Sequence, residues 1–221
     1  MLFLNFKEAN RCQPEDSSNR SYYDKNAANY VKSTQEVDMS ALYKRFIRYL
    51  PKGGRILDVG SGSGRDTLAF LKRGHSVEAF DASPMLAKLS SQITGIETKV
   101  MRFEELKEVE KYDGIWACAS LLHVREKDLP IIVSQLARAL RVGGAIYMSF
   151  KLGPGERISM DGRFFTDMDE ARLSLLIKCE PMLDLEEIWI TEGEDLFKGQ
   201  DIWLNAISVK HSTKATSNAT N

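Results

Sequence analysis

The sequence predicts a single α/β domain with a doubly wound, mostly parallel sheet. Short β-rich runs alternate with helical stretches over most of the chain, a glycine-rich turn follows the first of these runs, and an aspartate ends the second. Alternating strands and helices build a parallel sheet that is covered on both faces. With 221 residues and 43% hydrophobic composition, the chain has the size of one such domain.

The elements follow one another in a regular order. Apolar residues recur at helical spacing over residues 35–50 and again over 129–140, and glycines end both stretches. Residues 151–165 contain three glycines and a proline, which predicts a long loop. No helix-length periodic segment separates the last two strands, so they are expected to pair antiparallel at the sheet edge. The predicted strands are residues 55–60, 76–80, 97–101, 112–118, 145–150, 185–190 and 202–209.

The two ends and the overall charge limit the partners. Residues 1–21 are polar and aperiodic, which predicts a flexible segment, and residues 211–221 predict a disordered tail, leaving one domain over 22–210. The 30 basic and 31 acidic residues nearly cancel, which disfavours non-specific binding to nucleic acid or membranes. Three widely spaced cysteines and the absence of a long apolar run predict a reducing compartment, the cytoplasm.

The strongest motif is LDVGSGSGRD at residues 57–66, a strand that runs into a glycine-rich turn and then a helix. Glycines on alternate positions allow the backbone to approach a ligand closely. Asp81 ends the next strand, where a carboxylate can accept both ribose hydroxyls of an adenosine. The spacing predicts a nucleoside site at the carboxyl end of the sheet.

Two ligand classes compete for that turn. A dinucleotide fold needs a third glycine at the position that Arg65 occupies here, so a nicotinamide oxidoreductase is disfavoured. The carboxylate of Asp58, just before the glycines, suits a cationic group instead. S-adenosylmethionine carries such groups, a positively charged amino group and a sulfonium.

These motifs closely resemble the class I S-adenosylmethionine-dependent methyltransferases, particularly small stand-alone bacterial enzymes of the tellurite-resistance type. The resemblance extends over residues 22–210 and rests on the acid and glycine turn, on DASPM at 81–85, on the fourth strand and its exit, DGIWACASLLHV at 113–124, and on LRVGG at 140–144. It implies a Rossmann-like, seven-stranded sheet whose last strand is antiparallel. It also implies S-adenosylmethionine as cofactor and S-adenosylhomocysteine as product.

The resemblance assigns roles to particular residues. Asp58 and the glycine turn are expected to hold the methionine part, Asp81 the ribose and Phe103 the adenine through a backbone contact, because relatives carry an acid where this chain has Met101-Arg102. A segment from Tyr22 to Tyr30 is expected to close over the cofactor. The full predicted cofactor site is Tyr23, Tyr30, Asp58, Gly60, Ser61, Gly62, Gly64, Arg65, Asp66, Asp81, Ala82, Ser83, Met85, Phe103 and Ala119.

Two residues are candidates for the acceptor side. His123 follows the fourth strand and is either a general base or a histidine that only shapes the pocket. Arg163 is either a bidentate partner for a carboxylate or phosphate on the acceptor or part of a surface ion pair. No metal site is predicted. Methyl transfer can depend on positioning alone, so a catalytic base is not required.

The predicted function is methyl transfer by direct displacement to a small-molecule acceptor, whose reacting atom (O, N or S) the sequence leaves open. Alternatives are a methyltransferase acting on tRNA or protein, and a non-catalytic subunit that binds the cofactor and activates a partner. Basic residues on the helix before the first strand, at positions 44, 45, 48 and 52, form either a solvated face or an RNA-contacting stripe. No appended recognition domain is visible, and a monomer is favoured.

Overall fold

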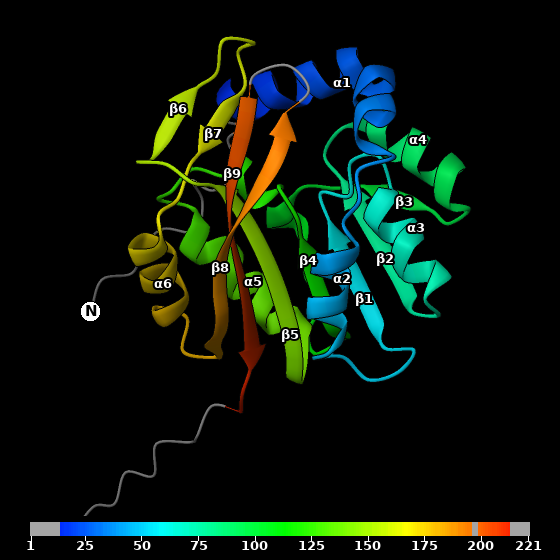
Figure 1. Cartoon of the computed structure of the whole chain (residues 1–221). Coiled ribbons are helices and arrows are strands. Elements are labelled where there is room, and N and C mark those ends of the chain that lie inside the picture. The colour runs from blue at the N-terminus through cyan, green and yellow to red at the C-terminus, as the bar shows by residue number, and fades with distance from the viewer. Residues whose placement is uncertain (1–13, 196–198, 213–221) are drawn as a thin grey trace, which may run out of the picture.

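The computed structural model describes residues 14–195 and 199–212. Seven strands form one sheet in the order β3-β2-β1-β4-β5-β9-β8, and Figure 1 shows helices packed around it. The helices are α1 (Pro14–Thr34), α2 (Ser40–Ile47), α3 (Arg65–Lys72), α4 (Pro84–Thr94), α5 (Leu129–Ala139) and α6 (Glu170–Lys178), with short 3-10 turns η1 (Phe103–Glu105) and η2 (Leu121–His123). The strands are β1 (Arg55–Val59), β2 (Ser76–Asp81), β3 (Thr98–Val100), β4 (Tyr112–Ala117), β5 (Leu140–Lys151), β6 (Glu156–Ile158), β7 (Phe164–Thr166), β8 (Leu183–Asp195) and β9 (Gly199–Lys210).

The sheet confirms the predicted fold class. Strands β3, β2, β1, β4 and β5 pair parallel, while β9 pairs antiparallel with β5 and with β8. The strand order changes direction at β1. From β1 the chain first adds β2 and β3 on one side, and then adds β4 and β5 on the other side. In open α/β sheets such a point leaves a crevice at the carboxyl ends of the strands.

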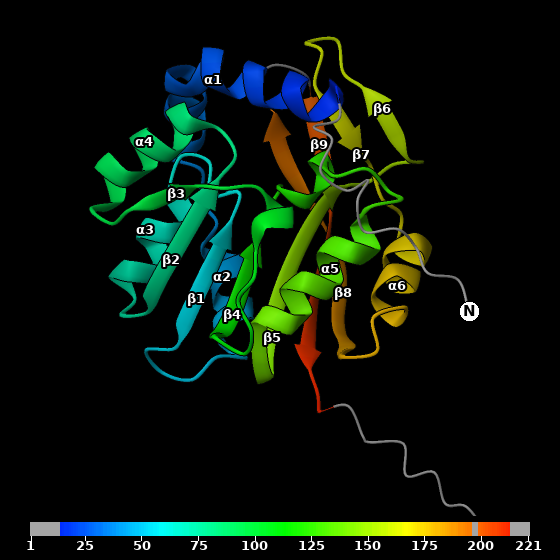
Figure 2. The same cartoon turned by 180° about the vertical axis from the view of Figure 1, so that it is seen from behind.

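Two apolar clusters fill the space between the sheet and its helices. One cluster joins α2 and α3 to one face through residues such as Phe46, Phe70 and Trp116. The other joins α5 and α6 to the opposite face through residues such as Leu136 and Ile177. Figure 1 shows α2 in front of the sheet, and Figure 2 shows α5 and α6 covering the back. Both faces are covered, as a parallel sheet requires.

Three boundaries differ from the sequence expectations. The helix predicted over 35–50 is shorter, Ser40–Ile47. The segment predicted as a long loop, 151–165, contains β6, which pairs antiparallel with β7 in a separate two-stranded sheet. The ordered domain, predicted to begin at residue 22, includes α1 from Pro14 onward, and Asn19 is buried. The predicted tail falls largely outside the described residues.

Helix α1 lies across the end of the sheet. In Figures 1 and 2 it runs over the strand ends from the side of α4 to the side of β6 and β7, and it contacts both α4 and β7. The helix therefore covers the edge where the carboxyl ends of the parallel strands meet.

Candidate active site

The turn between β1 and α3 has a backbone conformation that favours glycine. Gly60, Gly62 and Gly64 have φ angles of 70°, 55° and 75°, in the left-handed region that a Cβ disfavours. Space is restricted as well, because a Cβ on Gly60 would lie 2.6 Å from the Cβ of Ser120 and one on Gly64 would lie 2.6 Å from Oγ of Ser90. The turn therefore needs all three glycines.

Asp81 faces this turn from the end of β2. Its carboxyl oxygens accept hydrogen bonds from the backbone N–H groups of Gly62 and Ser83, both at 2.8 Å. Burial raises the pKa of Asp81 to about 6. Since a carboxylate oxygen can accept more than one hydrogen bond, Asp81 can bind hydroxyl groups of a ligand while it still holds the glycine turn.

A cavity of about 800 Å³ opens beside these residues. Its walls come from the carboxyl ends of β1, β2 and β4 and from α1, and its volume lies in the usual range for small-ligand sites. Most of the predicted site lines it. These residues are Tyr23, Tyr30, Gly60, Gly62, Asp81, Ala82, Ser83, Phe103, Ala119 and His123.

Helix α1 forms the cover of this cavity. Asp24 accepts a hydrogen bond from Oγ of Ser83 at 2.6 Å, which ties the helix to the start of α4. A Cβ on Gly62 would come within 3.0 Å of the Tyr30 ring, so this ring lies directly against the glycine turn. The cover predicted from Tyr22 to Tyr30 is thus a helix held against the cavity.

Two residues at the strand exits shape the wall. Phe103 packs edge-on against Phe80 with ring centroids 5.8 Å apart. Ala119, just after β4, has a φ of 50°, a conformation that costs a non-glycine residue free energy and clusters at functional sites. Its backbone N–H donates to Oγ of Ser149 at 2.8 Å, which helps to hold that conformation.

Ser120 is a wall residue that the sequence did not single out. It is 6% exposed, and its Oγ is buried without a hydrogen-bond partner among the described residues. A buried hydroxyl without a partner is costly, so a polar ligand group in the cavity would satisfy it. The glycine turn, Asp81 and Ser120 together fit a ligand with several hydroxyl and amino groups, as in S-adenosylmethionine.

His123, the candidate for contact with the methyl acceptor, joins α1 to β7. We call this part of the cavity wall, formed by Tyr23 and His123, the acceptor side. Nε2 of His123 lies 2.8 Å from the Tyr23 hydroxyl, and its Nδ1 lies 2.9 Å from the carbonyl oxygen of Phe164. The Asn19 amide pairs with the same backbone, accepting from the Phe164 N–H at 2.7 Å and donating to its carbonyl at 3.0 Å. Burial lowers the pKa of His123 to about 4, so this imidazole is neutral at physiological pH.

Arg163 forms the ion pair that was weighed against an acceptor contact. Its guanidinium binds Asp161 at 2.8 Å, lies over the Tyr22 ring at 4.6 Å from the centroid and donates to the Tyr23 hydroxyl at 3.3 Å. It is not among the cavity-lining residues of the described chain. Arg163 therefore reaches the cavity through Tyr23.

Arg65 and Asp66, predicted as cofactor ligands, point to the opposite side of the turn. Asp66 accepts hydrogen bonds from Tyr43 at 2.5 Å, Trp116 at 2.8 Å and Arg65 at 2.6 Å, all within the core beneath α2 and α3. The first turn of α3 directs both side chains into that core. A structural network, not the cavity wall, accounts for these two residues.

The remaining predicted residues also lie off the wall. Asp58 is 2% exposed and accepts a hydrogen bond from Thr67 at 2.6 Å; burial raises its pKa to about 8. Ser61 and Gly64 belong to the turn but do not line the cavity, and Met85 is 44% exposed, with its N–H directed to Asp24. A contact between Asp58 and a ligand would therefore need a bridging water.

Some wall residues had no usable sequence signal. Asn19 lay in the segment predicted as flexible, and Ile131 and Ile132 belong to a helix whose apolar spacing indicated only core packing. Arg102, at the departure from the family pattern, also lines the cavity. Their positions depend on contacts between distant parts of the chain.

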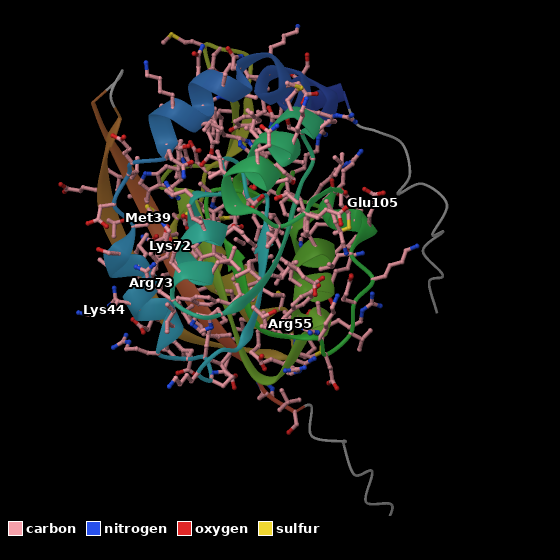
Figure 3. The ribbon with its side chains drawn as sticks, turned by 90° about the vertical axis from the view of Figure 1, so that its right-hand side faces the viewer. Met39, Lys44, Arg55, Lys72, Arg73 and Glu105 are labelled. Carbon is pink, nitrogen blue, oxygen red and sulfur yellow. The ribbon has the colours of Figure 1, made fainter. Side chains whose placement is uncertain are left out.

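Two of the four basic residues at and just after α2 are paired. Arg45 and Arg48 bind Glu187 of β8 at 2.5 and 2.9 Å, and Lys44 projects outward in Figure 3. This arrangement favours the solvated-face interpretation over an RNA site. Over residues 14–195 and 199–212, no three metal-ligating side chains gather, and no helix there has the length and apolarity that crossing a membrane requires.

Comparison with known proteins finds a methyltransferase domain in the middle of the chain. The model of a methyltransferase domain matches residues 56–144. Ubiquinone biosynthesis O-methyltransferase of Xanthomonas oryzae pv. oryzae is 30% identical over 105 residues, and the match spans 44% of this chain but only 43% of that protein. The chain therefore matches less than half the length of these curated relatives.

Two solved structures share the fold over nearly the whole chain. One is the 1,6-didemethyltoxoflavin-N1-methyltransferase of Burkholderia thailandensis, at 20% identity and a TM-score of 0.75, covering 96% of this chain and 99% of that chain. Another is the partner of the Trm112 methyltransferase activator of Haloferax volcanii, at 17% identity and a TM-score of 0.72, covering 90% and 100%. The match of residues 56–144 to a methyltransferase domain, the sheet order and the glycine turn all agree with a class I methyltransferase fold.

Proposed function

We propose that this chain transfers a methyl group from S-adenosylmethionine to a small-molecule acceptor by direct displacement. The observation that carries the proposal is the cavity in which the glycine turn, Asp81 and Ser120 meet. Names of similar proteins support it, because the Xanthomonas relative is an O-methyltransferase and the Burkholderia structure contains S-adenosylhomocysteine with a small heterocyclic substrate.

In this proposal, different residues bind different parts of the cofactor. Asp81 accepts the ribose hydroxyls, the Phe103 segment contacts the adenine and the turn from Gly60 to Gly62 receives the methionine part. Ser120, beside Gly60, donates to or accepts from a polar group of that part. Tyr30 and Tyr23, whose ring centroids lie 5.3 Å apart, present aromatic groups that can stabilise a cation.

The acceptor is positioned by the cover and by the exit of β4. When bound, S-adenosylmethionine supplies an electrophilic methyl group on a sulfonium. Helix α1 and His123 would shield the methyl group from water, and the uncharged side chains of His123 and Tyr23 suit a reaction in which positive charge is lost. Orientation of the acceptor by these residues is expected to supply much of the rate.

Calorimetric titration tests the cofactor assignment. S-adenosylmethionine and S-adenosylhomocysteine should bind the wild-type chain with micromolar affinity, and NADH should not bind. Asp81→Ala should lose at least about tenfold in affinity, because charge-assisted hydrogen bonds contribute about 1.5–3 kcal/mol. Asp184→Ala is the matched control, since this carboxylate lies on β8 with a side chain that is 66% exposed. NADH binding, or equal affinity for all three chains, would contradict the proposal.

We further propose that the chain acts in the cytoplasm as a monomer without a nucleic-acid partner. The pairing of Arg45 and Arg48 with Glu187 supports the absence of a nucleic-acid partner. Light scattering gives the mass in solution, and titration with tRNA at two salt concentrations detects salt-sensitive binding. A partner-dependent subunit would bind the cofactor and show no turnover with any acceptor until the partner is added.

A further inference from the structure

Three residues that are far apart in the sequence meet at the acceptor side of the cavity. Tyr23 and His123 are separated by 100 positions and lie 2.8 Å apart, from hydroxyl oxygen to Nε2. Arg163, 140 positions from Tyr23, donates to the same hydroxyl at 3.3 Å. Both Tyr23 and His123 line the cavity, so this cluster faces the space left for the acceptor.

Two contacts bear on the proton position in His123. The carbonyl oxygen of Phe164 only accepts and lies 2.9 Å from Nδ1, whereas the Asn19 amide nitrogen only donates and lies 3.1 Å from the same Nδ1. We assign the imidazole proton to Nδ1, because the contact with the carbonyl oxygen is the shorter one. The Asn19 amide nitrogen donates to the same carbonyl oxygen. Nε2 is then an acceptor, and Tyr23 donates its hydroxyl proton to it. A carbonyl behind Nδ1 thus orients the ring, as the third group does in a nucleophile–base pair.

We propose that Tyr23 and His123 form a proton relay that selects acceptors reacting through a hydroxyl group. This inference rests on the proposed methyl transfer. Tyr23 is the residue that touches the acceptor, His123 is the terminal base, and Arg163 and Asn19 are positioning residues. Arg163 uses one acceptor site on the Tyr23 oxygen, which leaves a second for the hydroxyl of the acceptor molecule.

The atoms and electrons balance in one displacement. A lone pair of the acceptor oxygen forms the bond to the methyl carbon, and the bond from methyl to sulfur breaks with its electron pair remaining on sulfur. The proton of the acceptor hydroxyl moves to the oxygen of Tyr23, while the hydroxyl proton of Tyr23 moves to Nε2 of His123. The products are a methyl ether, S-adenosylhomocysteine and an imidazolium.

The weakness of this base explains the selection. His123 is buried, and Arg163 and Lys151 on the surrounding elements disfavour its protonation further, whereas Asp161 opposes them. Such a base removes a proton only from a strongly acidic group. A hydroxyl group becomes strongly acidic when its oxygen is methylated, whereas a methylated aliphatic amine keeps its proton. A relay to His123 therefore assists an oxygen acceptor and gives little help to an amine.

Tyr23→Phe and His123→Asn test the relay, with Tyr22→Phe as the matched control. Tyr22 is the adjacent tyrosine of α1 and is not a wall residue. Methyl transfer would be measured with a hydroxyl panel (3,4-dihydroxybenzoate, other phenols and aliphatic alcohols) and with an aliphatic diamine, 3,4-bis(aminomethyl)benzoate. Each relay variant should lower kcat for the active hydroxyl probe about 100-fold, and the double variant should be no worse than either single one. The control should stay within about twofold.

Nuclear magnetic resonance can locate the ring proton of His123 without measuring turnover. The chain has three histidines, so loss of one signal in His123→Asn assigns the ring. Proton–nitrogen correlations should show the proton of His123 on Nδ1, and Tyr23→Phe should shift Nε2 whereas Tyr22→Phe should not. A proton on Nε2, or an Nε2 signal that ignores Tyr23→Phe, would overturn the relay.

The remaining outcomes separate the two proposals. Faster methylation of the diamine than of every hydroxyl probe, or no methylation of any hydroxyl probe by a chain that binds S-adenosylmethionine, would overturn the selection for hydroxyl acceptors. Failure of S-adenosylhomocysteine to bind would instead contradict the methyltransferase proposal, and the resonance measurement on the free protein would still decide the relay. Cofactor affinity is expected to stay unchanged in Tyr22→Phe and His123→Asn, and to change little in Tyr23→Phe, which keeps the aromatic ring.

Discussion

The two sides of the cavity are built in different ways. On the glycine-turn side, Gly60, Gly62 and Asp81 lie within 22 consecutive residues of the sequence, and backbone groups make the key contact, from the Gly62 N–H to Asp81. On the acceptor side, Asn19 and Phe164 are joined across 145 positions by side-chain hydrogen bonds. One side depends on local backbone geometry, whereas the other depends on distant side chains.

This difference indicates how each side can change. A left-handed turn with no room for a Cβ tolerates few substitutions, because strain and overlap add. The acceptor side is assembled from α1, the exit of β4 and β7, whose side chains can be exchanged while the sheet remains intact. The geometry explains how one fold can keep its cofactor site and vary its acceptor.

The largest expected effect tests the glycine-turn side. Gly60→Ala should abolish measurable binding of S-adenosylhomocysteine and lower the free energy of unfolding by about 3 kcal/mol. The left-handed conformation costs about 1–2 kcal/mol, and the overlap with Ser120 adds a similar amount. Calorimetry and chemical denaturation would measure both losses.

Gly74→Ala is the matched control for that substitution. Gly74 has a φ of 85°, and a Cβ there would meet nothing within 4 Å. It should show the conformational cost alone, about 1 kcal/mol, with unchanged ligand affinity. Equal effects at the two glycines would contradict the idea that close approach, and not the turn conformation alone, defines this side.

The pH dependence of binding should report Asp81. Because burial raises its pKa to about 6, the carboxylate form that accepts ribose hydroxyls is lost as pH falls through this value. Affinity for S-adenosylhomocysteine should be constant above about pH 7 and fall up to tenfold per unit below about pH 6. Titrations of wild type and Asp81→Asn compare the profiles, and an identical step in the variant would assign it to another group.

The raised pKa of Asp81 has the opposite effect on the stability of the free protein: acidic pH weakens ligand binding but favours the folded state. The folded state binds the proton of Asp81 more tightly than the unfolded state does. Its contribution to the free energy of unfolding is therefore greatest at acidic pH and declines as pH rises from the ordinary carboxyl range to about 6. A bound ligand that uses the carboxylate offsets that loss.

A moderate effect is expected where α1 meets β7. Asn19→Ala removes the partner of both the N–H and the C=O of Phe164, which should destabilise the chain by about 1–3 kcal/mol. Hydrogen exchange should accelerate over residues 18–23 and 164–166 but not in the glycine turn. Cofactor affinity should change little, since Asn19 does not touch that turn.

Asn26→Ala provides the comparison within the same helix. Within the described residues, the Asn26 amide bonds only locally, to the carbonyl of Tyr22 at 2.8 Å. Its loss should leave exchange at residues 164–166 unchanged. If both variants accelerate exchange equally, the contact of Asn19 with β7 does not hold the cover.

The smallest effect is expected at Asp161. Its ion pair with Arg163 lowers the pKa of its carboxyl well below the ordinary value, but both side chains remain partly exposed to solvent, so Asp161→Asn should cost no more than about 1 kcal/mol. A depressed pKa means that the contribution is present above the ordinary carboxyl pKa and is lost on acidification. Denaturation at neutral and acidic pH should show the difference shrinking, and a constant difference would contradict the ion-pair explanation.

The sequence predicted the sheet well because its strands carry strong local patterns. Residues 55–60 and 76–80 end within one residue of β1 and β2. The hairpin of β6 and β7 was missed, since two three-residue strands are too short to show an alternating pattern. The start of α1 was missed because the helix has no continuous apolar stripe; single residues such as Asn19 and Ala27 bury it.

For the site, residue type alone could not distinguish the two sides of the turn. Asp66 and Asp81 are both acids near the glycines, but the first turn of α3 directs Asp66 toward Tyr43 and Trp116. Arg163 could have served a ligand or an ion pair, and the structure shows it paired with Asp161. Each of these outcomes follows from the direction of a side chain, which spacing along the chain does not give.

The α/β sheet, the glycine turn and the acid at the end of β2 follow from local sequence patterns, because neighbouring residues set backbone conformation. Which groups meet at the acceptor side depends on the tertiary fold. There Tyr23, His123 and Phe164 form one hydrogen-bonded line, and their contacts exist only after the core has folded and fixed α1 across the strand ends. Local propensity carries no record of a contact between residues more than a hundred positions apart.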